Sequence, residues 1–303
     1  MIIILMKSPF PRQPGRLIAL VSAISLGLAL LAGCGAPASS QNQPTSGDGP
    51  RLVASFYPLQ WLTQQIAGPD TEVASLTPKG AEPHDSELEL SQVSALGQAD
   101  LMVTLGGFQA AVDQAIASNP PAVTVDLAPI VGLRNGDPHF WLDPTKLALA
   151  VQPITDALVQ ADPAGAVGYQ ERAAALDTAL AELDSDLAAG LKPFAGAYVV
   201  TTHAAFNYFA ERYGLIQIAV AGIDPEAEPT PARLKQVRDQ IGQLPVKTIY
   251  FEEPASTKTA QTLADDLGLT TGQLNPVETS TGGDYLTVMR VNLIALQEGL
   301  EAG

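Results

Sequence analysis

The sequence has few of the residues on which several common classes of protein depend. It contains a single cysteine in 303 residues, Cys34, so no disulfide bond can form within the chain. Its 16 lysines and arginines are outnumbered by 32 aspartates and glutamates, and the formal net charge is −16. Because nucleic acids attract basic surfaces, this balance argues against a nucleic-acid partner. Histidine is also scarce, with only three residues.

The first 33 residues have the layout of a secretory signal. Lys7, Arg12 and Arg16 come before an apolar run over residues 17–32, and the segment has no acidic residue. The run is shorter than the ~20 apolar residues that a membrane-spanning helix needs. It ends in Leu-Ala-Gly-Cys, which resembles the lipobox of bacterial lipoproteins and implies cleavage before Cys34 and lipidation of its thiol. The alternative is a free thiol at the end of an uncleaved anchor.

The next segment, residues 34–50, is predicted to be a flexible tether. It consists largely of Gly, Ser, Pro, Gln and Asn and has almost nothing apolar to bury, so it cannot offset the entropy lost on ordering. From residue 34 onward the chain carries 13 basic and 32 acidic residues, a net charge of −19. Such a surface favours solubility and mildly enriches cations around the protein.

Short apolar runs rich in β-branched residues recur through the rest of the chain. They cover residues 52–58, 99–106, 122–128, 197–202, 216–222 and 247–253. Near-continuous apolar runs are typical of strands buried on both faces of a parallel sheet. Segments with helical spacing, such as 86–99 and 230–244, lie between them. The alternation predicts an α/β fold with two lobes, each with a mostly parallel sheet flanked by helices.

Residues 163–191 differ from the rest because they show no strand signal and are dense in Ala, Leu and Glu. Pro163 can open a helix here, and Gly190 with Pro193 can close it. We therefore expect one long helix that joins the two lobes. The predicted divisions are a signal peptide at 1–33, a tether at 34–50, an N-terminal lobe at 51–162, the connecting helix at 163–191 and a C-terminal lobe at 192–303.

The three histidines, His84, His139 and His203, each stand where a loop meets the start of a helical pattern. Ligands of open α/β sheets bind beyond the carboxyl ends of the strands, and all three positions are of this kind. Imidazole is a common ligand of transition metals, and three imidazoles with one open position form a known zinc arrangement. The separations of 55 and 64 residues form no local metal motif, so an ordinary polar role stays open for any one of them.

The residues around the histidines, together with three later segments, form an ordered set of motifs. They are GAEPHDSELELSQVSALGQADLMVTLG, DPHFWLDP, THAAFNYFAERYGL, EPTPARL, FEEPAS and LNPVET. The set resembles the substrate-binding proteins of bacterial zinc/manganese ABC importers, from about residue 52 to the C-terminus. The resemblance implies two α/β lobes joined by a long helix, with a metal site between them formed by His84, His139 and His203. It also implies delivery of the ion to a membrane permease. With Cys34 lipidated, the protein would be anchored in the periplasm or at the extracytoplasmic face of a membrane.

The resemblance leaves the fourth ligand open. The family usually has an aspartate in a Leu-Asp-Pro-Leu type segment, where this chain has Asn275. An amide oxygen carries no charge and is a poorer ligand for a divalent cation. We expect three histidines completed by water, with Asn275, Glu253 or Glu278 as the alternatives. Around the second histidine, we expect Phe140 and Trp141 to pack beneath the imidazole, and Asp143 can cap a helix that begins near Pro144. For Trp141 and Asp143 we favour a role that only shapes the turn.

The ligand set favours zinc over manganese. Manganese prefers oxygen-rich sites, whereas imidazole suits zinc, copper and nickel. Relatives selective for manganese tend to have a carboxylate at the third motif, where this chain has His203. We therefore predict that zinc is the transported ion, and a manganese- or iron-binding member of the same family is the alternative.

Two functions of other classes also need weighing. Three histidines and a water can form a catalytic zinc centre, so a zinc-dependent hydrolase is one alternative. The sequence shows no motif for a positioned base beside the metal, and we expect no enzyme activity. The other alternative is an adhesin lipoprotein on the same scaffold, which would be favoured if the three histidines lay far apart in the fold.

Overall fold

The structure is a computed structural model that describes residues 49–252, 257–279, 281 and 283–301, without the side chains of 257–260. The interpretations of the signal peptide, of Cys34 and of Glu253 lie outside the described residues, as does nearly all of the tether. The described residues belong to one compact unit. Within them, no helix has both the length and the apolar character required to span a membrane.

The first lobe is built on a four-stranded parallel sheet with the strand order β2-β1-β3-β4. Its strands are β1 (Leu52–Ala54), β2 (Val73–Ser75), β3 (Leu101–Thr104) and β4 (Thr124–Asp126). Val53 in β1 is aligned with Ala74 on one side and with Met102 on the other. The central strands β1 and β3 are buried along their whole length, as their apolar sequences predict.

The second lobe repeats this topology with a parallel sheet of order β6-β5-β7-β8. Its strands are β5 (Tyr198–Thr201), β6 (Ile216–Ala219), β7 (Thr248–Glu252) and β8 (Thr270–Leu274). The prediction of two lobes with parallel sheets is confirmed. The edge strands β2 and β8 were not predicted, because small and polar residues in VAS and TTGQL leave no apolar run to detect.

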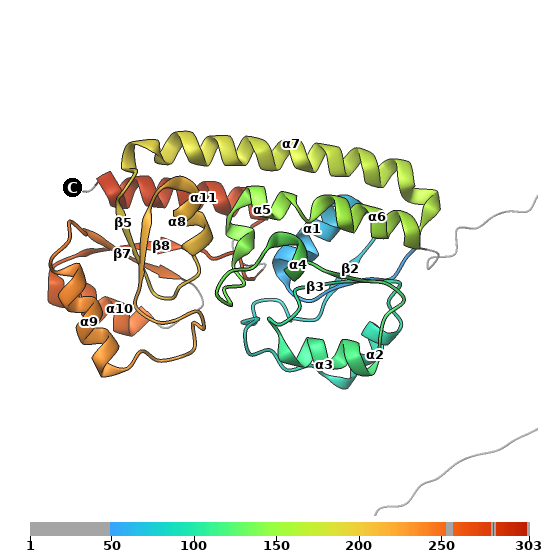
Figure 1. The fold of residues 1–303 in the computed structure, drawn as a ribbon, viewed down its shortest axis with the longest axis horizontal. Coiled ribbons are helices and arrows are strands. Elements are labelled where there is room, and N and C mark those ends of the chain that lie inside the picture. Colours follow the sequence, from blue (N-terminus) through green and yellow to red (C-terminus); the bar gives the residue numbers. More distant parts are fainter. Residues whose placement is uncertain (1–48, 253–256, 280, 282, 302–303) are drawn as a thin grey trace, which may run out of the picture. The chain divides into compact units, whose positions relative to one another are not determined.

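Helices flank both sheets (Figure 1). The α-helices are α1 (Tyr57–Ala67), α2 (Leu90–Gly97), α3 (Ala110–Ser118), α4 (Ala128–Val131), α5 (Pro144–Ala148), α6 (Val151–Ala161), α7 (Ala166–Leu191), α8 (Asn207–Tyr213), α9 (Pro231–Ile241), α10 (Thr257–Leu267) and α11 (Tyr285–Glu301). Short 3-10 turns are η1 (Phe140–Leu142), η2 (Pro163–Gly165) and η3 (Lys192–Phe194). Helix α2 begins four residues later than the helical pattern predicts, because Glu89 and Gln92 form a capping box that starts the helix at Leu90.

The predicted long helix is α7, with 26 residues, preceded by the 3-10 turn that contains Pro163. Leu176, Leu180, Leu183 and Leu187 are buried at alternating spacings of four and three residues, so they lie on one face of the helix. This face packs on α1, α5 and α6, which belong to the first lobe, and on α11, which packs against β8 of the second. In Figure 1 the helix runs past both sheets.

The core consists of one large apolar cluster that both lobes share and two smaller clusters, one in each lobe. One large cluster combines buried residues of the first sheet, such as Leu52, with the α7 leucines and residues of the second sheet, such as Val199. The outer face of each sheet has a smaller cluster of its own, around Met102 in the first lobe and Ile249 in the second. Because the two lobes share their largest apolar cluster, rotation of one lobe against the other would expose buried apolar surface.

Candidate metal centre

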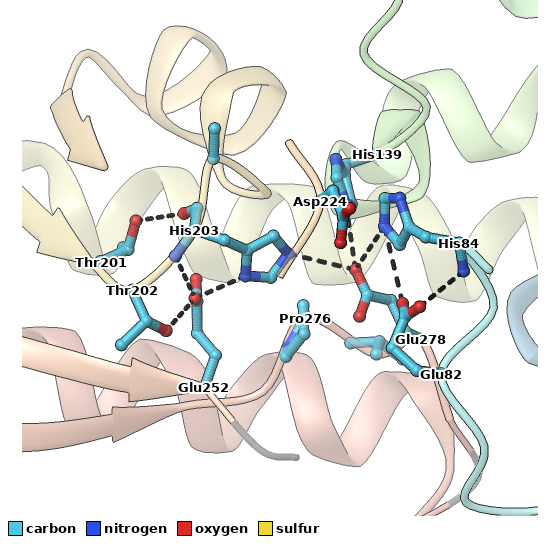
Figure 2. A network of polar contacts seen from close by, with 12 residues as sticks. Glu82, His84, His139, Thr201, Thr202, His203, Asp224, Glu252, Pro276 and Glu278 are labelled. Carbon is cyan, nitrogen blue, oxygen red and sulfur yellow. Dashed lines mark hydrogen bonds and ion pairs between the residues drawn. The ribbon is translucent and has the colours of Figure 1, made fainter. Parts of the chain in front are cut away.

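The structure brings His84, His139 and His203 together, and it adds Glu278 to them (Figure 2). One nitrogen or oxygen atom from each of the four side chains lies within 4.8 Å of the other three. His84 and His139 come from loops of the first lobe, after β2 and α4, and His203 and Glu278 follow β5 and β8 in the second. The group therefore lies where the carboxyl ends of strands from both sheets meet, as expected for parallel sheets.

His84 is held by the loop Glu82-Pro83-His84 just ahead of α2. Its backbone N–H donates to Glu82 Oε2 at 2.8 Å, and its ring stands edge-on against Phe108 with centroids 4.8 Å apart. Among the described residues, the Nε2 atom has no hydrogen-bond partner although it is buried. A buried imidazole nitrogen without a partner is costly unless a ligand occupies it, so this atom points to a binding role.

His139 follows a tight turn at Arg134–Asp137, in which Asn135 and Gly136 have φ values of 54° and 74°. Asn-Gly is the pair that a turn with two left-handed central residues favours. Asp137 then accepts hydrogen bonds at Oδ1 from the His139 backbone N–H at 3.0 Å and from its Nδ1 at 2.7 Å. The ring is fully buried, and its Nε2 faces Glu278 Oε1 at 2.9 Å.

The residues after His139 behave largely as predicted. The Trp141 ring lies 5.1 Å from the His139 ring, centroid to centroid, and Phe140 packs against Trp141. Asp143 caps α5 by accepting from the backbone N–H of Thr145. Trp141 does more than shape a turn, because its Nε1 donates to the Pro276 carbonyl at 2.8 Å. That bond ties the His139 loop to the segment that carries Glu278.

His203 lies two residues beyond the carboxyl end of β5, a central strand of the second sheet. Its Nδ1 lies 2.6 Å from Glu252 Oε2, and the same oxygen accepts from the His203 backbone N–H at 2.8 Å and from the Thr202 hydroxyl. Figure 2 shows this cluster on the second lobe. The Nε2 atom points the other way and lies 3.3 Å from Glu278 Oε1.

Glu278 lies beside the three histidines as a fourth potential donor, at the position for which we expected a water. Val277, with φ 59°, takes the left-handed conformation that is rare for a β-branched residue, and the turn is held by Asn275, whose Oδ1 accepts from the Val277 N–H at 2.7 Å. The Asn275 amide is thus engaged in shaping the turn and does not join the cluster. Glu278, one of the alternatives, is 2% exposed and directs Oε1 at all three histidines.

The distances from Glu278 to the three histidine nitrogens are close to those within a tetrahedral metal site, and all four atoms lie within 4.8 Å of one another. Four ligands at about 2.0–2.1 Å from a tetrahedral zinc lie about 3.3 Å from one another. The distances from Glu278 Oε1 to the Nε2 atoms of His139, His203 and His84 are 2.9, 3.3 and 3.6 Å. Three neutral imidazoles and one carboxylate would leave one negative charge opposite a divalent cation, which suits zinc.

The surrounding carboxylates favour protons on His139 and His203. Burial is the largest influence on His203 and lowers its pKa, but the charge of Glu252 and hydrogen bonds outweigh burial and raise the pKa to about 10. For His139, burial is again largest and lowers the pKa, yet the bonds to Asp137 and Glu278 leave it raised. Burial also opposes ionisation of Glu278, but the histidine hydrogen bonds hold its pKa well below the usual range. A metal must therefore displace protons to bind.

Sequence reasoning missed the two carboxylates that orient the imidazoles. Asp137 and Glu252 each bind the Nδ1 of one histidine and thereby direct its Nε2 toward the centre. Carboxylates of this kind set the ring orientation and raise the basicity of a metal-binding histidine. Asp137, two residues before His139, could have been suspected from its position. Glu252 could not, because 49 residues separate it from His203.

Two α/β lobes with a cluster of histidines and a carboxylate between their sheets are typical of two-lobed metal-binding proteins. The family model for the periplasmic zinc-uptake complex component A, ZnuA, matches residues 52–299. The chain belongs to this family.

Two curated relatives illustrate the similarity. The high-affinity zinc uptake system protein ZnuA of Bacillus subtilis is 31% identical over 299 residues, covering 89% of this chain and 94% of that protein. The zinc-binding protein AdcA of Streptococcus pyogenes is 32% identical over 284 residues, covering 82% of this chain. The chain spans about half of the AdcA relatives, 55% of their length.

Solved structures agree with the fold. The laminin-binding protein Lmb of Streptococcus agalactiae, described as a bifunctional protein with adhesin and metal-transporting activity, matches with a TM-score of 0.77 and 31% identity. The match covers 83% of this chain and 100% of that one. The Zn(II)-bound ZnuA-like domain of Streptococcus pneumoniae AdcA matches with a TM-score of 0.72 and 34% identity, over 84% and 99% of the two chains.

Proposed function

We propose that this protein binds zinc outside the cytoplasm and delivers it to an ABC permease. The ligands are the Nε2 atoms of His84, His139 and His203 and the carboxylate of Glu278. The observation that carries the proposal is the convergence of these four potential donors, from two lobes, within 4.8 Å of one another. Membership in the zinc-uptake family supports the same cargo.

The ligand chemistry favours zinc over manganese or iron. Three of the four donors are imidazoles, whereas manganese prefers oxygen ligands. The single carboxylate balances half of the charge of a divalent ion and should strengthen binding of zinc relative to three histidines with water. Glu253, another of the alternatives, lies outside the described residues.

Binding would join the two lobes through the ion. His84 and His139 belong to the first lobe, and His203 and Glu278 to the second. A bound ion would therefore add metal–ligand bonds between the lobes. The shared apolar cluster around α7 should keep this closure small. The permease would then distinguish the loaded from the metal-free form by the arrangement of the lobes.

The location and the domain divisions are part of the same proposal. A signal peptide at 1–33, a lipid on Cys34 and a tether at 34–50 would hold lobes 51–162 and 192–303, joined by the helix at 163–191, beside the membrane that contains the permease. One curated relative, from Streptococcus pneumoniae, is named a zinc-binding lipoprotein. Metabolic labelling with a radioactive fatty acid should mark the wild-type chain, and Cys34→Ser should abolish the label.

A competitive titration tests the cargo. Metal-free protein is titrated with zinc and with manganese at neutral pH against a chelator of known affinity. We expect tight one-to-one binding of zinc and much weaker binding of manganese. His139→Ala should abolish tight zinc binding while circular dichroism shows an intact fold. Manganese bound as tightly as zinc would reassign the cargo, and unchanged zinc affinity in the variant would contradict the site.

The other classes of function are less well supported. The family consists of zinc-uptake components, and we propose that the chain has no hydrolase activity. An esterase assay of the zinc-loaded protein checks this. An adhesin function has one observation in its favour, the similarity to the laminin-binding protein Lmb. Binding of the purified chain to immobilised laminin, measured with and without zinc, would decide whether it applies here.

A further inference from the structure

An acidic cavity lies beside the metal centre and reaches the surface of the protein. It encloses about 280 Å³ and is lined by Pro78, Ala81, Glu82, Asp85, Ser86, Glu87 and Glu226. Four of these seven residues carry carboxylates. Among the described residues, none of the four forms an ion pair with lysine or arginine. A concave surface with one sign of charge concentrates ions of the opposite sign.

Glu82 connects this cavity to the histidines. Its side chain is only 10% exposed, although it lines the cavity. Its Oε2 is engaged by the His84 backbone N–H, whereas its Oε1 is buried and has no hydrogen-bond partner among the described residues. Oε1 lies 3.8 Å from the His84 Nε2, the least enclosed of the three imidazole donors, and Figure 2 shows the two groups side by side.

A second cavity also reaches the centre but is less suited to a cation. It encloses about 310 Å³ and is lined by Tyr57, Gln60, Ser75, Thr77, Pro78, Lys79, Ala81, Glu278 and Thr279. Apart from the ligand Glu278, its only charged lining residue is Lys79, which would repel an incoming divalent ion. The charges of the two cavities therefore favour approach from the side of Glu82.

From this geometry, and on the basis of the proposed function, we propose that Glu82 is a transfer ligand through which zinc enters and leaves the site. The ion would collect in the cavity of Glu82, Asp85, Glu87 and Glu226, bind Glu82 Oε1, and pass to His84 and then to the remaining ligands. Glu226 belongs to the second lobe, so the entrance is formed by both lobes and narrows if they close.

The physical reason lies in the cost of removing water from a divalent ion. A bare ion cannot cross into a buried site unless each lost water is replaced by another donor. A carboxylate oxygen 3.8 Å from a histidine nitrogen can share one ion with it, because two ligands of one zinc are about 3.3 Å apart. A donor that contacts the ion only in transit stabilises the transition state in both directions, so it speeds capture and release by the same factor.

The test compares zinc exchange by the full chain and by Glu82→Gln, which retains an oxygen for the His84 N–H. Stopped-flow mixing with zinc gives the association rate constant, and transfer to an excess of chelator gives the dissociation rate constant. Both should fall by about tenfold, the lower end of what a charged cleft contributes to association. Glu72→Gln, an exposed carboxylate after α1, is the charge-matched control and should exchange zinc at the wild-type rate.

Three results would overturn the proposal. Wild-type rates in Glu82→Gln would exclude a transfer role. Faster dissociation with a matching loss of affinity would make Glu82 an ordinary ligand of the filled site. Faster exchange in Lys79→Gln, with no change in Glu82→Gln, would assign the route to the other cavity. A wild-type chain that binds no zinc at equilibrium would instead refute the proposed function itself, and this inference with it.

Discussion

Replacing Glu278 with glutamine tests whether this carboxylate is the fourth zinc ligand, a position for which the sequence favoured water. The carboxylate is buried and directs one oxygen at three imidazole nitrogens over 2.9–3.6 Å. Glutamine has the same shape and retains a carbonyl oxygen, so the change removes charge while leaving the packing in place. The variant therefore separates a charged metal ligand from a residue that only fills space.

The expected loss of zinc affinity is large. Breaking a buried charge pair by removing one partner costs about 3–5 kcal/mol. The amide oxygen can still contact the ion, and the desolvation cost of the carboxylate disappears, so we take the lower figure. About 3 kcal/mol corresponds to roughly 100-fold weaker binding. Zinc also stabilises the protein against unfolding. At a free zinc concentration well above the dissociation constants of both proteins, this stabilisation should be about 2.7 kcal/mol smaller for the variant than for the wild type.

Two measurements check this expectation. Competition with a chelator at neutral pH gives the affinity, and thermal unfolding with and without zinc gives the stabilisation. Glu72→Gln carries the same charge change at an exposed site and should behave as the wild type in both. If Glu278→Gln bound zinc within threefold of the wild type, Glu278 would not be a ligand, and the fourth position would belong to water.

Four further predictions concern the site and the core. Asp137→Asn should weaken zinc binding by about 10- to 100-fold, because Asp137 orients His139 at 2.7 Å; an unchanged titration would contradict this. Zinc should displace at least one proton at pH 7, from His203, read from calorimetry in buffers of different ionisation enthalpy, and near-zero release would be inconsistent with a protonated His203. Folding raises the pKa of His203 from 6.5 to about 10, so protonation of this residue stabilises the fold. In the absence of metal, the stabilisation is complete below pH 6.5 and is lost as the pH rises toward 10. The melting temperature should therefore decline over this range. Leu183→Ala in α7 should destabilise the fold by about 2–5 kcal/mol in denaturant titrations, and a loss under 1 kcal/mol would question the shared core.

The sequence by itself determined the central strands, the long helix and three of the four potential donors. Apolar runs such as 101–104 and 248–252 specify buried strands, because a strand covered on both faces needs apolar side chains throughout. The Ala- and Leu-rich stretch specifies α7 through its leucine spacing. The three histidines stood out because the chain has no others.

The tertiary structure decided what surrounds the imidazoles. Glu278 was one of several candidates for the fourth position, and nothing local selects it as the one that meets His139 from 139 positions away. Its direction depends on a left-handed Val277, a conformation that residue type disfavours and only the turn around Asn275 imposes. Glu252 reaches His203 because β7 lies beside β5 in the sheet. The periodicity of apolar residues specifies helices and strands. Side chains that are distant in the sequence come together only when those helices and strands pack.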